Sequence, residues 1–150
     1  MVLRDYRDGD FEGLVVLDRS CFEPGIAYSA AEMQRYLSLA TREAIVAESE
    51  GEIVGFCLGY RAPQDIGRII TLDVRSDRRR SGLGRELLTS TILRLASAGA
   101  RETVLEVDER NQGAIAFYEE LGFRRRGKIP NYYGPGRPAL KMCRKVADGG

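Results

Sequence analysis

Histidine is absent from this chain of 150 residues, and cysteine is rare. Without histidine the chain cannot build Ser-His or Cys-His nucleophiles, and it lacks the commonest zinc ligand. The cysteines, Cys21, Cys57 and Cys143, are odd in number and widely spaced, so they form no metal-binding or disulfide pattern. We therefore expect reduced thiols, a cytoplasmic protein and no bound metal.

Long apolar runs and an excess of charge of one sign are also missing. No stretch approaches the roughly 20 apolar residues that span a bilayer, and the sequence MVLRDYRDGD has no signal-peptide core. The formal net charge of +1 gives no general electrostatic reason to bind nucleic acid or a membrane. The composition, 43% hydrophobic and 30% charged without repeats or linkers, predicts one domain over residues 1–150 with a frayed tail at 147–150.

Strand and helix patterns are mixed along the chain. Apolar and β-branched segments predict strands at 2–4, 44–48, 53–62, 69–74, 103–107, 123–129 and 139–146, with a turn at 63–67. Helical spacing predicts helices at 8–21, 30–39, 83–98 and 111–121. Ser29 and Glu32 form a capping-box pattern before the second helix. This order predicts an α/β (α+β) fold, a single mixed, mostly antiparallel twisted sheet of six to seven strands with about four helices on its faces.

The most informative stretch is 69–98. It passes from a strand through three consecutive arginines, Arg78 to Arg80, and a Gly-rich turn into a helix. The first turn of a helix has N–H groups without partners and a dipole that favours anions. Gly82 and Gly84 let a phosphate approach the backbone without a Cβ in the way. The stretch predicts a site for a phosphate-bearing cofactor, and the alternative is an ordinary turn beside solvated arginines.

Three polar residues stand out further along the chain. Strand alternation puts Glu106 on the face opposite Leu105 and Val107, either as a surface carboxylate or as a functional group. Asn111 is suited to cap the helix that follows. Tyr118 lies about two turns further along the same helix face, either as a core aromatic or as part of a site.

Together these motifs resemble the Gcn5-related N-acetyltransferase (GNAT) family. The run Arg79-Arg80-Ser81-Gly82-Leu83-Gly84-Arg85, preceded by Leu72-Asp73-Val74, is similar to that family's acyl-CoA motif: Gln or Arg, two residues, Gly, one residue, Gly or Ala. The later segment from Leu105 to Phe123, with Asn131-Tyr132-Tyr133, is similar to the RimI-type ribosomal-protein-alanine N-acetyltransferases. The resemblance extends from about residue 53 to residue 142.

This resemblance implies a set of roles. Acetyl-CoA would be the cofactor, and its pantetheine arm would bind the backbone of 72–74 like an extra strand. The cofactor-binding residues implied are Leu72, Asp73, Val74, Arg79, Arg80, Ser81, Gly82, Leu83, Gly84, Arg85, Asn111 and Tyr118. Glu106 would be the general base, directly or through a water, and Tyr118 the general acid that protonates the departing CoA thiolate.

Direct acetyl transfer agrees with the missing histidine, because positioned reactants and proton transfer suffice without a covalent intermediate. A ping-pong route through Cys21 or Cys57 is the less favoured alternative, since an unactivated cysteine is usually a small hydrophobe. A protein α-amino group has a pKa near ~7.8 and lysine near ~10.4, so lysine costs roughly 3.5 kcal/mol more to deprotonate. A single carboxylate base is therefore better matched to an N-terminal amine.

Two loops, 22–29 and 130–138, are expected to select the acceptor. Tyr28, Tyr132 and Tyr133 would line a groove for the first residues of a peptide, and Glu23 would attract its ammonium group. The alternative is that these tyrosines only pack the loops. The main hypothesis is a monomeric or homodimeric enzyme that acetylates a protein N-terminus, such as that of a ribosomal protein. The alternatives are an acetyltransferase of a small amine or a lysine side chain, and a non-catalytic acyl-CoA-binding module.

Overall fold

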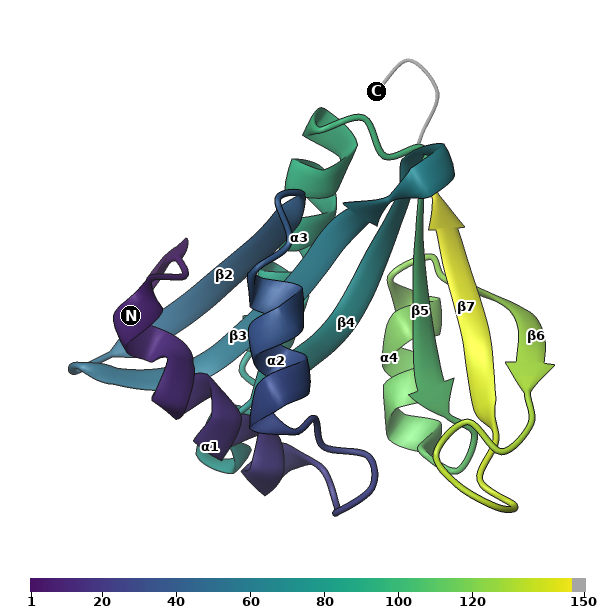
Figure 1. Ribbon diagram of the computed structural model, residues 1–150, viewed down its shortest axis with the longest axis horizontal. Helices are drawn as coiled ribbons and strands as arrows, with labels where there is room; N and C mark the ends of the chain where they lie inside the picture. Colours follow the sequence, from purple (N-terminus) through teal and green to yellow (C-terminus); the bar gives the residue numbers. More distant parts are fainter. Residues whose placement is uncertain (147–150) are drawn as a thin grey trace.

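A computed structural model describes residues 1–146, and in them seven strands form one twisted sheet (Figure 1). The strand order is β1-β2-β3-β4-β5-β7-β6, and every neighbouring pair is antiparallel except β4 and β5. The strands are β1 Val2–Asp5, β2 Arg42–Ser49, β3 Glu52–Ala62, β4 Ile66–Val74, β5 Glu102–Asp108, β6 Arg124–Ile129 and β7 Ala139–Lys145. The predicted mixed, mostly antiparallel sheet is confirmed. The frayed tail predicted at 147–150 lies outside the described residues.

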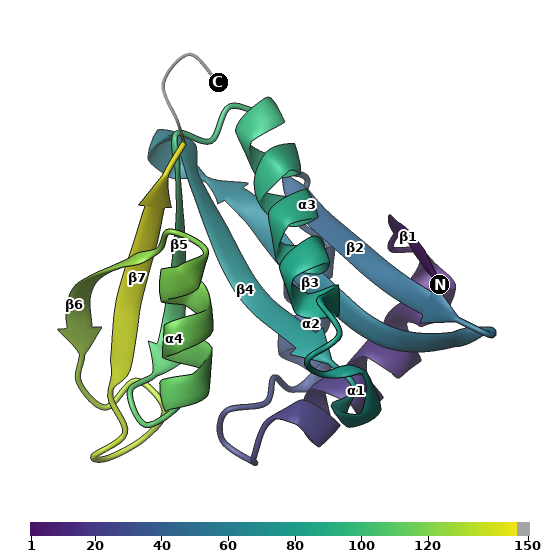
Figure 2. The same cartoon turned by 180° about the vertical axis from the view of Figure 1, so that it is seen from behind.

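Four α-helices cover the sheet: α1 Phe11–Cys21, α2 Ala30–Leu37, α3 Leu83–Ser97 and α4 Gln112–Glu120. Helices α1 and α2 lie on one face of β2–β4 and α3 on the other, while α4 covers β5 and β7 on the same side as α3 (Figures 1 and 2). The predicted capping box is present, because Ser29 Oγ accepts from the Glu32 N–H and Glu32 accepts from the Ser29 N–H. No helix within residues 1–146 combines the length and apolarity needed to cross a membrane.

Helix α3 packs directly on the sheet because glycines lie beneath it. A Cβ on Gly59 would come within 2.8 Å of the Arg68 carbonyl oxygen, and one on Gly55 within 3.0 Å of both the Asp73 carbonyl oxygen and the Leu87 side chain. Leucines on the inner side of α3 are almost completely buried against these strands. The close approach of α3 therefore fixes the place where its N-terminus meets the end of β4.

The sheet divides into two halves between β4 and β5. These strands pair only from Ile66–Arg68 to Glu102–Val104. The register of β3 with β4 passes from Leu58–Thr71 to Gly59–Ile69, so Ile70 is an extra residue that bends β4. Beyond this point the strands diverge, as Figure 1 shows. We call β1–β4 the N-terminal half and β5, β7 and β6 the C-terminal half.

Candidate active site

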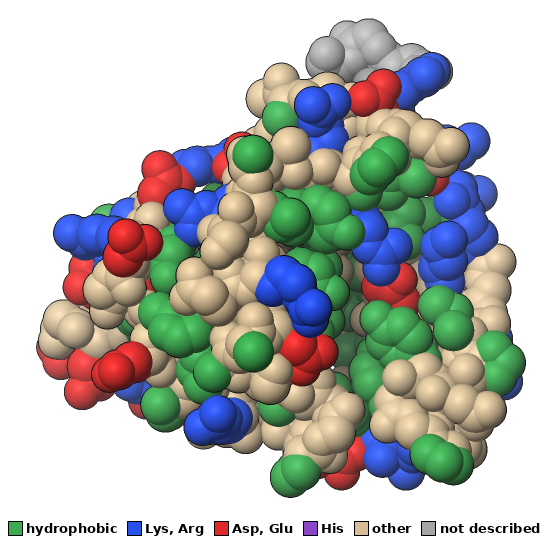
Figure 3. Space-filling model, viewed as in Figure 1, with side chains coloured by type: hydrophobic (Ala, Val, Ile, Leu, Met, Phe, Trp, Pro, Cys, Tyr) green, Lys and Arg blue, Asp and Glu red, His purple; other side chains and the backbone are tan. Residues whose placement is uncertain are grey.

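Two cavities meet where the halves diverge. The inner cavity, about 340 Å³, is lined by β4, β5, the start of α4 and the loops at 22–29 and 130–138. The arginine cleft, about 450 Å³, lies between the end of β4, the N-terminus of α3 and one side of α4. They share Cys21, Phe22, Leu72, Asn111, Ala114 and Tyr118, so they form one continuous space. Figure 3 shows the hollow between the two halves.

The N-terminus of α3 is open toward the arginine cleft. Its N-cap residue Gly82 has a φ of +86°, a conformation that favours glycine, and no side chain of residues 1–146 caps the helix. The first i→i−4 bond runs from the Glu86 N–H to the Gly82 carbonyl. By contrast, α2 and α4 are capped by Ser29 and Asn111. The first turn of α3 therefore keeps N–H groups that can bind an anion.

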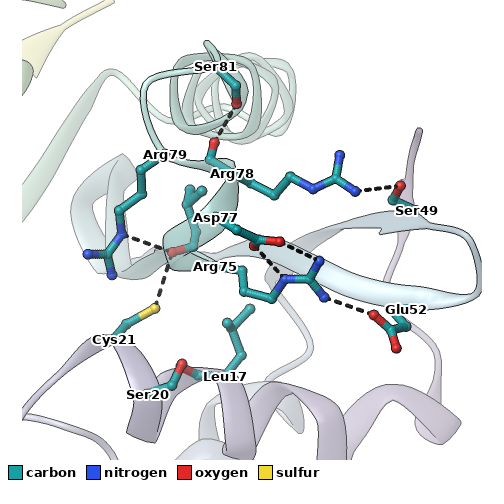
Figure 4. A network of polar contacts seen from close by, with 11 residues as sticks. Leu17, Ser20, Cys21, Ser49, Glu52, Arg75, Asp77, Arg78, Arg79 and Ser81 are labelled. Carbon is teal, nitrogen blue, oxygen red and sulfur yellow. Dashed lines mark hydrogen bonds and ion pairs between the residues drawn. The ribbon is translucent and has the colours of Figure 1, made fainter.

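Unpaired arginines surround this helix end. Arg79, Arg80 and Arg85 line the cleft, and none has a carboxylate of residues 1–146 within ion-pair distance. Arg78 also lines the cleft, but its guanidinium extends to Ser49 and donates to Ser49 Oγ at 3.1 Å (Figure 4). Arg79 Nε donates to the Val74 carbonyl at 3.2 Å. Guanidinium groups beside free N–H groups suit a diphosphate or a phosphate monoester.

Not every residue of the predicted cofactor set faces the cleft. The Leu72 and Val74 side chains line it, but the Asp73 side chain is fully buried on the other face of β4. There Thr71 Oγ1 donates to Asp73 Oδ1 at 2.5 Å. The Leu83 side chain is buried in the core, and the Ser81 hydroxyl donates to the Arg78 carbonyl. The side chains of Asp73 and Leu83 therefore do not face the cleft, and only their backbone can serve it; their place in the cofactor set stays a prediction.

Glu106 lies in the inner cavity beside an arginine that the sequence analysis missed. Its carboxylate, with 9% of the side chain exposed, is 2.5 Å from Arg68 Nη2 at the point where β4 and β5 separate. The interpretation of 63–67 as a turn left Arg68 outside any element, whereas β4 begins at Ile66. Extending the strand by three residues would have placed Arg68 beside β5. The ion pair fixes the position of the carboxylate in the cavity.

Tyr118 and Asn111 join the two cavities from α4. The Tyr118 ring packs edge-on against Phe117 and Phe123, with centroid distances of 5.4 and 5.8 Å. Burial raises the pKa of the Tyr118 hydroxyl, so it stays protonated near neutral pH and can donate a proton. Asn111 Oδ1 accepts from the Ala114 N–H at 3.1 Å, which confirms it as the N-cap of α4. Glu106 and Tyr118 come from opposite faces of the sheet and line the same cavity.

The predicted acceptor residues all line the inner cavity. The Tyr28 hydroxyl donates to the Ile70 carbonyl at 3.2 Å, at the bulge. Tyr132 and Tyr133 pack edge-on with centroids 4.8 Å apart. Burial raises the pKa of all three hydroxyls, so these side chains are neutral hydrogen-bonding groups.

Glu23 has a different environment from the one predicted. Its carboxylate pairs with Arg137 and, at 3.3 Å, with Arg110. Arg137 also bonds Asp108 at 3.0 Å. Glu23 therefore links the loop at 22–29 to the loop at 130–138, and its charge is engaged rather than free for an ammonium group.

The thiols near the cavities are poor nucleophiles. Cys21 is half-buried and donates to the Val74 carbonyl at 3.5 Å, and burial raises its pKa. Burial raises the pKa of Cys57 to about 12. Both thiols therefore stay protonated, which disfavours a covalent acetyl-cysteine route. Among residues 1–146 no group of three or more His, Cys, Asp or Glu side chains is placed to hold a metal ion.

Comparison with known proteins agrees with this geometry. The sequence pattern of the acetyltransferase (GNAT) family matches residues 11–123. The chain belongs to this family, and it is an N-acetyltransferase. Acetyl-CoA is the donor that GNAT enzymes use, and the open α3 N-terminus and its arginines fit the phosphates of such a donor.

Sequence and structural relatives extend the match over the whole chain. An uncharacterized N-acetyltransferase of Methanocaldococcus jannaschii is 31% identical over 97% of this chain and 92% of its own length. The N-alpha-acetyltransferase MAK3 of Arabidopsis thaliana is 30% identical over 85% of this chain and 67% of its own length. The crystal structure of the ribosomal-protein-S18-alanine N-acetyltransferase from Escherichia coli superposes with a TM-score of 0.87 and 23% identity, covering 99% of this chain and 96% of that one. The predicted resemblance to the GNAT family is confirmed. The similarity to the Escherichia coli structure is a similarity of fold.

Proposed function

We propose that this enzyme transfers the acetyl group of acetyl-CoA to the N-terminal α-amino group of a protein, such as a ribosomal protein, in the cytoplasm. The observation that carries the proposal is the continuity of the two cavities through Tyr118 and Asn111. A donor bound in the arginine cleft can reach an amine bound beside Glu106. The N-alpha-acetyltransferase relative supports a protein N-terminus as the acceptor.

The residues of the arginine cleft would hold the donor. Arg79, Arg80 and Arg85 would neutralise its phosphates together with the free N–H groups at 82–85. Beyond Arg68, β4 no longer pairs with β5, so the backbone of Leu72–Val74 has a free edge toward the cavity. This edge would bond the pantetheine amides as a neighbouring strand does. The bound donor supplies a thioester, which is an activated acetyl group.

Glu106 and Tyr118 would move the two protons of the reaction. Glu106 accepts the proton of the incoming ammonium, directly or through a water, while Arg68 holds its carboxylate in place. Tyr118 gives its proton to the departing thiolate, for which its raised pKa is suited because the hydroxyl is protonated before transfer. Tyr28, Tyr132 and Tyr133 would bind the first residues of the acceptor with their neutral hydroxyls and rings.

The acceptor preference follows from the cost of deprotonating the acceptor amine. An α-amino group, with a pKa near ~7.8, is substantially neutral at physiological pH, whereas a lysine amine with a pKa near ~10.4 costs roughly 3.5 kcal/mol more to deprotonate. The site is therefore better matched to a protein N-terminus than to a lysine side chain.

Thiol release from acetyl-CoA tests the proposal. The acceptors are peptides with a free N-terminus and no lysine, the same peptides with a blocked N-terminus and one lysine, and polyamines. We expect release with the first group at least about tenfold faster than with the others, given the cost of deprotonating lysine. Mass spectrometry should locate the acetyl group on the α-nitrogen. Release with small amines or lysine alone would overturn the proposal and favour the alternative acceptors.

A further inference from the structure

Positive charge is concentrated in one segment of the chain. Residues 124–145 contain eight lysines and arginines and no aspartate or glutamate, although the whole chain has a net charge of only +1. The eight are Arg124, Arg125, Arg126, Lys128, Arg137, Lys141, Arg144 and Lys145. This segment forms β6, β7 and the loop between them, which contributes Tyr132 and Tyr133 to the inner cavity.

Strand pairing shows which of these side chains share a face. Lys141 pairs with Glu106, and Cys143 pairs with both Val104 and Arg124. Because side chains that pair across strands share a face, Lys141, Arg124 and Lys145 lie on the Glu106 face. Arg126, an extra residue in β6, joins them through two bonds to Glu102 at 3.0 and 2.9 Å. We call Arg124, Arg126, Lys141 and Lys145 the basic shelf.

No helix of residues 1–146 covers this face of the C-terminal half, since α4 lies on the other one (Figures 1 and 2). Val104 and Cys143 are nonetheless buried there, at 2% and 9% exposure. Among the basic side chains of this face, Arg124, Arg126 and Lys145 are exposed and Lys141 is half-buried. Figure 3 shows lysine and arginine side chains gathered over β7 and β6, beside the hollow.

The charges of the shelf are only partly compensated. Glu102 is engaged by Arg126. Neither Arg124 nor Lys141 has a carboxylate of residues 1–146 within ion-pair distance. On the opposite face of the same strand, Arg125 is paired with Glu119 at 3.5 Å. The shelf therefore presents net positive charge beside the cavity.

The shelf starts at the acceptor site itself. Lys141 is the cross-strand neighbour of Glu106, and adjacent strands lie about 4.8 Å apart. Arg124 on β6 is two strands away and two residues further along, level with Val104. Two spacings of about 4.8 Å and an offset of about 6.8 Å put it roughly 12 Å from Glu106, or three to four residues of extended chain at ~3.4 Å each. A polypeptide with its amine at Glu106 reaches the shelf with its third to sixth residues.

We propose that the basic shelf selects acceptor polypeptides with aspartate or glutamate close behind the N-terminal residue. This inference rests on the proposed function and names the substrate class of the same site. An acidic polypeptide is favoured over a nucleic acid because the shelf lies beside the amine site: Lys141 is the cross-strand neighbour of Glu106, and the loop between β6 and β7 lines the inner cavity. Acidic side chains also replace water around Arg124 and Lys141 with charge-assisted hydrogen bonds.

The test uses three peptides with the same first two residues and with acidic, neutral or basic residues at positions three to six. We expect kcat/KM to fall in that order, with about a tenfold range at low salt for two or three exposed ion pairs. The range should shrink in high salt, because exposed charges are screened. Equal kcat/KM for the three peptides would overturn this inference while leaving the proposed function intact. If none of the three peptides reacted while small amines were acetylated rapidly, both this inference and the proposed function would be overturned.

A pair of double variants locates the effect. Arg124→Gln with Lys141→Gln should bring the ratio of kcat/KM for acidic over neutral peptide close to one. The matched control, Arg125→Gln with Arg144→Gln, removes two charges from the other face of the same strands and should leave the ratio unchanged. Substitution of Lys141 can also affect its neighbour Glu106. Arg124→Gln alone avoids this and should lower the ratio partway. The inference would be overturned if both double variants changed the ratio equally. It would also be overturned if the wild type bound a single-stranded RNA, the first double variant lost that binding, and all peptides reacted alike.

Discussion

The two halves of the sheet differ in how their faces are covered. In the N-terminal half, α1 and α2 lie on one face of β2–β4 and α3 on the other (Figures 1 and 2). In the C-terminal half, α4 is the one helix of residues 1–146 that covers a face (Figures 1 and 2), and Arg124, Arg126 and Lys145 on the opposite face are exposed. The N-terminal half is a core that fixes α3 and β4. The proposed chemistry lies along the boundary between the halves and on the uncovered face.

Two carboxyl groups beside this boundary show what the difference does. Asp73 on β4 is fully buried, and burial together with the nearby Asp18 raises its pKa well above the usual range. Glu106 on β5 faces the inner cavity and is paired with Arg68 at 2.5 Å. The N-terminal half, covered on both faces, buries its carboxyl group, Asp73, in the core. The C-terminal half leaves its carboxyl group, Glu106, facing the inner cavity.

The largest expected effect comes from removing the two proposed proton carriers. Glu106→Gln and Tyr118→Phe should each lower kcat by about 10²-fold or more, because general acid or base catalysis contributes on that scale. Donor binding should change little in Glu106→Gln, since Glu106 does not line the arginine cleft. Steady-state kinetics with a calorimetric titration of CoA checks this. A Tyr118→Phe enzyme with unchanged kcat would assign the proton transfer to solvent.

A substitution in the N-terminal half should lower the stability of the protein rather than its activity. Gly59→Ala would bring a Cβ within 2.8 Å of the Arg68 carbonyl oxygen and 3.3 Å of the side chain of Leu95 on α3. Overpacking of this kind costs about 1–3 kcal/mol, or roughly 2–12 °C in the thermal midpoint of a chain of this size. Thermal denaturation followed by circular dichroism measures it, with Gly127→Ala, where no atom lies within 4 Å of the added Cβ, as the control. Equal midpoints for both variants would contradict the close packing of α3.

Much of this arrangement could be predicted because its signals are local. The sequence pattern located the seven strands and four α-helices of residues 1–146 to within about three residues, although the start of β4 was predicted to be a turn. Short-range caps such as Ser29 and Asn111 marked helix starts. The Gly-rich run before α3 predicted an anion site, since uncapped N–H groups and glycines lie within a few residues of each other. Strand alternation also separates Asp73 from Leu72 and Val74, but the sequence analysis placed all three in the cofactor set without using it.

The parts that could not be predicted depend on contacts between distant residues. Arg68 meets Glu106 across 38 positions of sequence, and Glu23 meets Arg137 across 114. Nothing local to either carboxylate indicates its partner. The bulge at Ile70 also interrupts the alternation of β4, so the faces before and after it cannot be related by counting residues.

The smallest expected effect concerns the pH dependence of the covered half. A raised pKa means that folded Asp73 binds its proton more tightly than the unfolded chain does, so its stabilising contribution is complete below the unfolded pKa and is lost as pH rises through the folded pKa. Asparagine can still accept from Thr71 and needs no proton. Asp73→Asn should therefore gain stability relative to the wild type with rising pH, on the order of 1 kcal/mol for a buried unpaired charge.

Asp10 provides the opposite case within the same half. Its hydrogen bonds from Arg4, at 2.8 and 2.9 Å, lower its pKa. Its contribution is therefore present above the unfolded pKa and is lost as pH falls through the folded one. Asp10→Asn should destabilise the protein at neutral pH, and the loss should shrink below about pH 4. Urea denaturation from about pH 3 to about pH 9 compares the two variants. If both differences from wild type changed in the same direction with pH, the raised pKa of Asp73 would be contradicted, and the contrast between buried and accessible carboxyl groups would rest on geometry alone.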